Sequence, residues 1–534
     1  MSTVEAREAV VPRAHAARRR RSVSRKGPQF APETELKFEL EPAALERLGR
    51  HPLFQAPAKT AHLRSVYFDT PEFKLKNGGF SLRVRHSDQG FVQTLKRRSG
   101  SGLFERDEWE REVDAEAPDA KAIAETPAGE VVNGDSERLE PVFTSTVERD
   151  VRMFEDDRAL IEVSLDQGEI TTSDQSEAIR EVELELKAGE RVALFTLARD
   201  LVDQAGLRLS FESKSERGYR LAEHSGLTAR KAEVAGLKPG MCSADAFRHV
   251  VRGGLVQISS NAALLRRART PESLHQARVG LRRLRAALGA FSDMLAGGGY
   301  HHLKGEMRWL AHELGEARDL DVFIDATFRP AAAASEEPAL DAFGDRLMRA
   351  QAKAYDRAVA AIESPRFSKL LLETAAWAEV GDWTSNPRKS CKRLREEPIS
   401  AFARRSLQRL YRKLRKRGAR FDTLDVEGRH RLRIAGKKLV YASDLLGPVF
   451  GGHPKRRRRF ISALKGLQDG LGALNDLAVA PEVALKSAGA REPELAFAAG
   501  EIVGRRRAEE GPLIKAAASA WDELKDHRPF WRDR

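Results

Sequence analysis

Hydrophobic and polar residues alternate along much of the chain between residues 31 and 224. At the start of this region Glu33, Glu35 and Lys37 occupy every second position, and Leu36 and Phe38 fall on the other parity. Successive side chains of a strand point to opposite faces, so two carboxylates and an ammonium share one face and the apolar pair shares the other. The pattern predicts a strand with a charged face.

The same alternation recurs further along this region, and each time the polar face carries charges. These faces are Arg83/Arg85, Arg106/Glu108/Glu110, Glu162/Ser164/Asp166 and Glu181/Glu183/Glu185/Lys187, and Lys96 shares one side of its strand with Val92 and Thr94. Helical spacing occurs only at residues 42–51 and 191–206. Many antiparallel strands with few helices indicate an α+β domain. If the sheet closes into a barrel, the charged faces line a polar interior; periodicity alone leaves open that they face solvent.

From residue 240 to residue 534 apolar residues recur every three to four positions, which predicts helices. His275, Arg278, Arg282 and Arg283 recur as His430, Arg433, Lys437 and Lys438, at an offset of 155 residues. The segment LGEARDLDV from Leu314 likewise recurs as LGALNDLAV from Leu471, at an offset of 157. Two ordered matches at nearly one offset predict an all-α helical bundle with an internal two-fold repeat. Residues 225–239 are expected to be a linker.

The charge is divided unevenly along the 534 residues, which are too many for one core and predict two or three domains. Residues 31–224 carry a net charge of −13, residues 225–534 a net charge of +20, and residues 1–30 a net charge of +6. Such a division indicates two domains with different partners, of which the second attracts polyanions. Residues 1–30 are expected to be a disordered basic arm that serves either as a solubilising tail or as a polyanion-binding segment.

Neither a membrane segment nor a secretion signal is expected. No apolar run approaches the roughly 18–20 residues that cross a bilayer, and the N-terminus has no apolar core of a signal peptide. Cys242 and Cys391 lie far apart without metal-ligand spacing, and we expect reduced thiols in a cytoplasmic protein.

The helical repeat concentrates cations on one stripe. His275, Arg278, Arg282 and Arg285 are spaced so that they share one helix face, and the second copy repeats the stripe. Like charges this close disfavour the helix unless an anion joins them, and arginine binds phosphate oxygens bidentately. A solvated basic face is the alternative. Aromatic platforms for bases are few, so a phosphate-only polyanion is favoured over nucleic acid.

The charged faces of the first region suggest a different chemistry. Arginines and lysines that face inward can hold several phosphates, whereas carboxylates cannot contact phosphate without a mediating cation. Mg²⁺ and Mn²⁺ prefer oxygen ligands and fill this role. In Glu33-x-Glu35-x-Lys37 the acids would then bind metal and the lysine would bind phosphate, and such a metal can activate water.

Several ordered motifs resemble a known family. Glu33-x-Glu35-x-Lys37, YFDTP, LRVR, TLK, RDEWE, EVELELK and SKSERGY are similar to a CYTH domain, over residues 31–224. The tandem His/Arg repeat with RDLD and LND resembles a CHAD domain, over residues 240–534. The first resemblance implies an eight-stranded antiparallel barrel, the triphosphate tunnel.

The resemblance also implies roles for individual residues. The implied metal ligands are Glu33, Glu35, Asp166, Glu183 and Glu185, with Glu162 as a further candidate, and Glu33, Glu35, Lys37 and Glu185 are the implied catalytic residues. The implied phosphate-binding residues are Lys37, Arg83, Arg85, Lys96, Arg106, Arg149 and Lys214. The implied polyphosphate-binding residues are His275, Arg278, Arg282, Arg283, Arg285, His430, Arg433, Lys437 and Lys438.

Together these features lead to the expectation of an inorganic triphosphatase that uses Mg²⁺ or Mn²⁺ and carries a polyphosphate-binding helical domain. It would release pyrophosphate and phosphate, bind no membrane, and lie in the cytoplasm or at polyphosphate granules. A CYTH adenylate cyclase, an organic triphosphatase and a non-catalytic polyphosphate-binding protein are the alternatives, and nucleic-acid binding is disfavoured.

Overall fold

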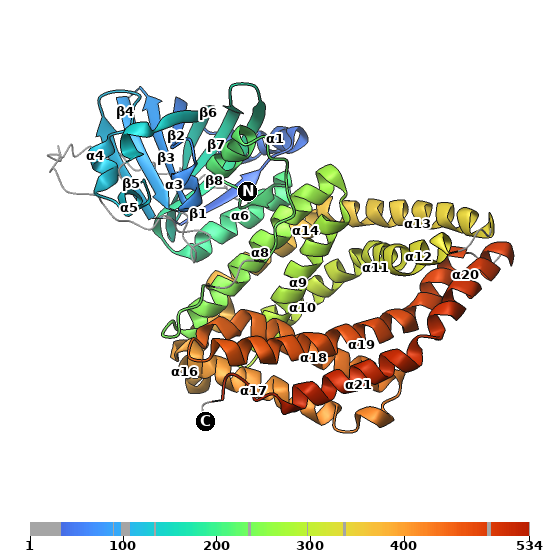
Figure 1. Cartoon of the computed structure of the whole chain (residues 1–534). Coiled ribbons are helices and arrows are strands. Elements are labelled where there is room, and N and C mark those ends of the chain that lie inside the picture. Colours follow the sequence, from blue (N-terminus) through green and yellow to red (C-terminus); the bar gives the residue numbers. More distant parts are fainter. Residues whose placement is uncertain are drawn as a thin grey trace, which may run out of the picture.

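The computed structural model describes residues 34–88, 90–97, 107–132, 135–232, 236–295, 297–334, 338–488 and 493–532. An N-terminal sheet domain packs against one end of a larger helical domain (Figure 1). The predicted arm at residues 1–30 lies outside the described residues, as do Glu33 and Arg106. None of the helices in the described ranges is long and apolar enough to cross a membrane.

The first domain is built on one antiparallel sheet of nine strands. The strands are β1 (Glu35–Glu39), β2 (Lys59–Asp69), β3 (Phe80–Ser87), β4 (Gly90–Arg97), β5 (Asp107–Val113), β6 (Glu140–Glu155), β7 (Ala159–Thr171), β8 (Ser176–Gly189) and β9 (Arg208–Ser210). Their order across the sheet is β5-β4-β3-β2-β6-β7-β8-β1-β9. The first strand of the chain therefore pairs with β8 near one edge of the sheet.

The sheet differs from the eight-stranded closed barrel that the resemblance implied. Over the residues that the structure describes, β5 and β9 form the two edges of the sheet and are not paired with each other. The ninth strand arises because the chain returns from a helix and adds three residues, Arg208–Ser210, beside β1. The predicted α+β architecture is confirmed, whereas closure of the sheet is not.

Apolar residues of the strands pack outward against short helices. Leu36 and Phe38 of β1 join Val182 and Leu184 of β8 in one core, beneath α1 (Pro42–Leu48) and α6 (Arg191–Ala205). Residues of β2, β3 and β4 form a second core. The helices that cover it are α3 (Lys74–Asn77), α4 (Ala120–Ala124) and α5 (Ala128–Val132); α2 (Pro52–Gln55) precedes β2. The charged sides of the strands are left on the opposite, inner face of the sheet.

Helix α6 is covered on two sides, because it lies between the sheet and α14 (Pro365–Val380) of the helical domain. Buried residues recur along its whole length, and they belong to a single apolar cluster that continues into the second domain. Arg199 and Lys369 form ion pairs across this contact, with Glu373 and Asp203 at 2.6 and 2.8 Å. The two domains thus share a core.

Helix α7 (Lys214–Ala222) lies on the inner face of the sheet, against β6 and β7. Ser213 caps its N-terminus with Glu216 in a reciprocal capping box. Gly218 lets the helix approach closely, because a Cβ there would lie 2.1 Å from the ring of Phe143. Tyr219 packs edge-on against the same ring and donates a hydrogen bond to Asp69. This packing directs Lys214 into the sheet.

The second domain is almost wholly helical. Its helices are α8 (Ser243–Ala268), α9 (Pro271–Ala290), α10 (Gly298–Glu313), α11 (Gly315–Phe323), α12 (Arg329–Ala333), α13 (Pro338–Glu363), α14, α15 (Asp382–Ser385), α16 (Lys389–Glu396), α17 (Ile399–Arg417), α18 (Val426–Leu446), α19 (Pro454–Ala488), α20 (Pro493–Arg507) and α21 (Glu510–Asp526). The duplicated segments fall on α9 with α11 and on α18 with α19. Helices α9 and α18 pack against each other, so the two copies of the repeat meet.

Candidate functional site

The charged faces of the strands lie on one face of the sheet. Strand register places Glu35, Glu185 and Glu162 side by side across β1, β8 and β7. The next row is Lys37, Glu183 and Ser164, and the row after it is Glu39, Glu181, Asp166 and Arg149. Glu181 and Asp166 are fully buried and Lys37 is 7% exposed. The solvent-facing interpretation is therefore wrong for these strands.

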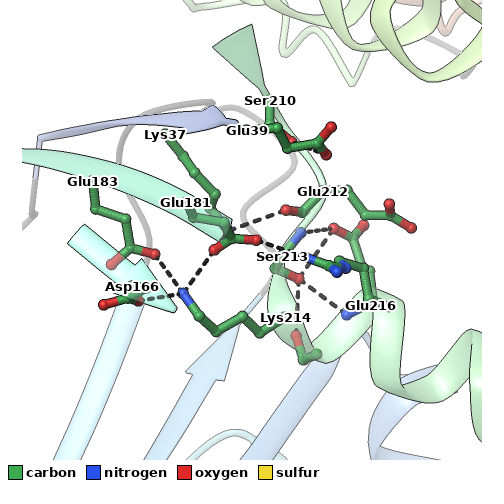
Figure 2. A network of polar contacts seen from close by, with 12 residues as sticks. Lys37, Glu39, Asp166, Glu181, Glu183, Ser210, Glu212, Ser213, Lys214 and Glu216 are labelled. Atoms are coloured by element: carbon green, nitrogen blue, oxygen red, sulfur yellow. Dashed lines mark hydrogen bonds and ion pairs between the residues drawn. The ribbon is translucent and has the colours of Figure 1, made fainter. Parts of the chain in front are cut away.

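Three carboxylates converge on the ammonium of Lys214. Its Nζ lies 2.8 Å from Asp166, 2.7 Å from Glu181 and 3.0 Å from Glu183 (Figure 2). The carboxylate oxygens of these three acids lie within 4.8 Å of one another, which would allow them to hold a metal ion. In this conformation the lysine neutralises them instead.

Three further cations surround the same carboxylates. Arg149 donates to both oxygens of Asp166 at 2.6 Å and to Glu183 at 2.6 Å. Arg217, from the next turn of α7, donates to Glu181 at 2.8 Å. The Nζ of Lys37 lies 3.8 Å from Glu181 and donates to the backbone carbonyl of Glu212 at 3.0 Å. Every buried acid here has more than one positive partner.

These contacts control the protonation of the cluster. Burial alone would raise the pKa of Glu181, but Lys214 and Lys37 outweigh it and lower that pKa to about 2. Burial would likewise raise the pKa of Glu183, but Lys214 and Arg149 hold this pKa well below the usual value. Burial would lower the pKa of Lys214, but its carboxylate neighbours raise that pKa well above the usual value. Glu181, Glu183 and Lys214 therefore remain ionised at neutral pH.

We expect this cluster to make the protein sensitive to acid. The pKa of Glu181 is lowered from 4.5 to about 2 in the folded protein. Its contribution, roughly 3 kcal/mol, is therefore fully present above pH 4.5 and lost as the pH falls towards 2. Urea unfolding at several pH values between 6 and 3 measures this slope, and Glu181→Gln should flatten it. An unchanged slope in that variant would contradict the assignment.

The row Glu35, Glu185 and Glu162 has less positive charge around it. Lys187 contacts Glu185 at 2.6 Å and Glu162 at 3.6 Å. Glu35 is half-buried and lies directly opposite Glu185. This row thus places three carboxylates next to the compensated cluster.

Basic residues continue the inner face on β3 and β4. Arg83 lies opposite Tyr67 and Thr94, Arg85 lies two residues further along β3, and Lys96 lies opposite Ser81. Lys96 forms an ion pair with Glu108 at 2.8 Å. Burial alone would lower the pKa of Arg83, but Tyr67 and Glu108 raise this pKa above its usual value. The sheet therefore presents acids on β1, β7 and β8 and cations on β3 and β4, as the alternation predicted.

Two residues of the cluster were not among the predicted site residues. Glu181 belongs to the same alternation as Glu183 and Glu185, so the signal for it was present in the sequence. Arg217 follows Lys214 by three positions, which places both on one face of a helix. The predicted Glu33 and Arg106 lie outside the described residues.

The helical domain gathers a second group of charged residues where α9 meets α18. Burial and the neighbouring Arg433 and Arg282 lower the pKa of Lys437 to about 8. Burial, together with Arg282 and Arg318, also lowers the pKa of Arg278, although Asp319 opposes this. Cations from both copies of the repeat thus lie close enough to repel one another.

Two acids lie among these cations. Asp319 and Asp476 occupy equivalent positions in the two copies of the repeat, and each interacts with the arginine of its own copy, Arg278 or Arg433. Several buried nitrogens in this group have no hydrogen-bond partner: His275 Nδ1, Arg278 Nε, Arg282 Nε and Arg433 Nε. Buried donors without partners are costly, so the group suits an added acceptor.

The remaining predicted cations of the helical domain are placed differently. His430 is exposed and contacts Asn475 at 3.0 Å. Arg285 and Lys438 lie near each other and extend the group towards the surface. Arg283 lines a cavity between the two domains.

Comparison with known families agrees with both halves of this structure. Residues 31–219 match the family model of the CYTH domain, and residues 249–485 match that of the CHAD domain. The chain carries a CYTH domain and a CHAD domain. The nine-stranded sheet is its CYTH domain, and the helices from α8 onward form its CHAD domain.

Individual relatives cover parts of the chain. An inorganic triphosphatase of Haemophilus influenzae is 31% identical over 175 residues, which are 31% of this chain and 47% of that protein, so the match spans less than half of the relative. A CHAD domain of the plant Ricinus communis is 28% identical with a TM-score of 0.50, and the match covers 57% of this chain and 98% of that one. A Hippeastrum protein with a dominant triphosphatase activity is 17% identical and covers 37% of this chain and 98% of that chain; its TM-score of 0.28 supports no conclusion.

Proposed function

We propose that the CYTH domain hydrolyses inorganic triphosphate to pyrophosphate and phosphate with the help of Mg²⁺ or Mn²⁺. The proposal rests chiefly on the row Glu35, Glu185 and Glu162, which faces the same side of the sheet as Arg83 and Arg85. Acids that can bind a cation thus lie on one surface with cations that can bind phosphate. The relative from Haemophilus influenzae, an inorganic triphosphatase, supports this substrate.

The two acidic groups differ in how available they are to a metal ion. Asp166, Glu181 and Glu183 are already neutralised by Lys214 and by arginines. Glu35, Glu185 and Glu162 have Lys187 as their nearby cation, and carboxylate oxygens are the ligands that Mg²⁺ and Mn²⁺ prefer. We therefore assign the metal to Glu35, Glu185 and Glu162. A metal bound there would neutralise phosphate oxygens and lower the pKa of a bound water.

The protein side chains would contribute charge and position. Lys37, Arg83 and Arg85 can each donate to phosphate oxygens and hold the chain along the sheet. Lys214 and Arg149 keep Glu183 ionised and hold Asp166 in place, so the substrate meets a prearranged surface. Catalysis of phosphoryl transfer depends mainly on such positioning and neutralisation.

The test is phosphate release by the purified chain. Inorganic triphosphate, ATP and long-chain polyphosphate are each supplied with Mg²⁺, with Mn²⁺ and with EDTA. We expect metal-dependent release from triphosphate and little from ATP. Faster release from ATP would favour an organic triphosphatase, and pyrophosphate formed together with cyclic AMP would favour a cyclase. No release from any substrate would favour the non-catalytic polyphosphate-binding protein.

We further propose that the CHAD domain binds polyphosphate where α9 meets α18. The unpartnered nitrogens of Arg278, Arg282 and Arg433 and the mutual repulsion of these cations support this assignment. A bound chain of phosphates would accept hydrogen bonds from these nitrogens and would reduce the repulsion between the cations. Both polyphosphate and RNA release counterions on binding, so their affinities depend on salt in the same way and a salt titration does not distinguish them. Direct competition between polyphosphate and RNA for the domain does distinguish this function from nucleic-acid binding.

Binding to this group should weaken as the pH rises through 8. Lys437 has a pKa of about 8 in the free protein, so it is charged at pH 7 and mostly neutral at pH 9. Loss of one charge-assisted contact lowers the affinity for polyphosphate by about tenfold. Titrations of long-chain polyphosphate at pH 7 and pH 9 measure the change. The variant Lys437→Arg keeps its positive charge at pH 9, so it should lose most of the difference in affinity between pH 7 and pH 9. An equal pH dependence in that variant would contradict the assignment.

A further inference from the structure

A cavity of about 900 Å³ lies between the two domains. Its walls come from the ends of β1, β3 and β4, from β9 and α7, from the segment after α7, and from α8, α9 and α14. The volume falls within the range of ordinary ligand sites. The cavity is thus formed by both domains together and by the connection between them.

The cavity continues the inner face of the sheet. Glu39, Ser81 and Lys96 line the cavity. Each of them lies two residues from an inward-facing residue of the same strand: Glu39 from Lys37, Ser81 from Arg83, and Lys96 from Thr94. In an antiparallel sheet these three positions lie at the same end of the strands. Glu35 lies four residues from Glu39, or about 13 Å along β1. A linear ligand held at Glu35 and Lys37 can therefore extend into the cavity.

The lining of the cavity carries more cations than acids, and five of the cations are themselves ion-paired: Lys76, Lys96, Arg208, Arg220 and Arg252. Among the described lining residues, ten are lysine or arginine and four are glutamate. The glutamates already have partners: Glu39 accepts from Ser210, Glu212 pairs with Arg220, Glu216 belongs to the capping box of α7, and Glu223 pairs with Lys76. Burial and the neighbouring Arg208 lower the pKa of Arg266, although Glu39 and Glu41 oppose this, and the guanidinium of Arg266 lies 4.0 Å from the carboxylate of Glu41.

We propose that this cavity binds the part of a linear polyphosphate chain that extends beyond the triphosphate on the sheet. The inference rests on the proposed function, because it takes the inner face as the site for the end of the chain. Arg266 of α8 and Lys231 of the connection supply contacts that a triphosphate does not reach. The CHAD domain then takes part in selecting the chain length of the ligand.

The test uses the full chain and the double variant Arg266→Gln with Lys231→Gln, neither of which lies on the inner face of the sheet. Displacement of labelled triphosphate by unlabelled triphosphate, by tetraphosphate and by chains of about ten phosphates is measured in Mg²⁺ at low temperature and again in EDTA. Polyphosphate that binds only at α9 and α18 does not displace the label. The matched control, Arg269→Asn with Arg357→Gln, removes two charges from exposed positions outside the cavity; asparagine tolerates the left-handed backbone of residue 269.

We expect the cavity variant to bind the longer chains about five- to tenfold more weakly, and triphosphate within twofold of the wild-type affinity. The control should change all three affinities equally and by less. Equal loss for triphosphate and for the longer chains, or loss of the same size in the control, would overturn the proposal. Failure of the proposed function shows separately, as absence of phosphate release, because displacement requires no turnover.

Discussion

Replacement of Glu35 or Glu185 with glutamine is expected to lower the rate of metal-dependent triphosphate hydrolysis by about 1,000-fold. The two side chains lie opposite each other on β1 and β8, and each carboxamide removes one negative oxygen ligand from the row that we assign to the metal. The substitution keeps the size of the side chain, so the sheet should stay folded. Phosphate release in Mg²⁺ and in Mn²⁺, together with the melting temperature, measures both effects.

Glu112→Gln is the matched control for this experiment. Glu112 is on the same face of the sheet but is exposed on the edge strand β5. It should keep the activity of the wild-type protein. Wild-type rates in both Glu35→Gln and Glu185→Gln would show that the metal assignment is wrong, and a large fall in melting temperature would mean that these acids are structural.

Replacement of Lys214 with methionine is expected to lower the free energy of unfolding by roughly 3 kcal/mol at pH 7. The substitution leaves Asp166, Glu181 and Glu183 buried without the ammonium that contacts all three. Burial without a partner raises the pKa of a carboxyl group, so the deficit should shrink as the pH falls and the acids take up protons. Urea unfolding at pH 7 and at pH 4 measures the difference.

The same variant tests the capacity of this cluster for a metal ion. Three carboxylates within 4.8 Å of one another become a cation site once the lysine is removed, so Mg²⁺ or Mn²⁺ should raise the melting temperature of Lys214→Met more than that of the wild type. Lys59→Met, an exposed substitution on β2, serves as the control and should cost little. A Lys214→Met protein as stable as this control would mean that the cluster does not need its central cation.

Strands such as β1, β3 and β8 could be predicted from the sequence because apolar and charged residues alternate in them, whereas β6 and β9 were not predicted. Leu36 and Phe38 against Glu35 and Lys37 fixed both the strand and its two faces. The buried position of Lys214 could not be predicted in this way. The helix that carries Lys214 is short and charged, like many solvent-facing segments. This helix packs on the inner face of the sheet because Gly218 allows close contact with Phe143, a residue 75 positions away.

The arginine stripe of the CHAD domain shows a similar limit. The repeat paired Arg278 with Arg433, and the helices that carry them, α9 and α18, pack against each other. Arg283 was assigned to the same group; adjacent helical positions point about 100° apart, and Arg283 also lines the cavity. The cavity itself was not predictable, because segments that are distant in the sequence, from both domains and from the connection between them, form it.

The position of α6 bears on how such a two-domain chain can change during evolution. A helix buried on both sides gives each domain an apolar surface that only the other covers. Recombination that exchanged one domain for an unrelated one would expose that surface and invite aggregation. The connecting peptide can lengthen or shorten with little cost, whereas the facing surfaces of α6 and α14 must change together. We therefore expect the pair to be inherited as one unit and its two halves to diverge in step.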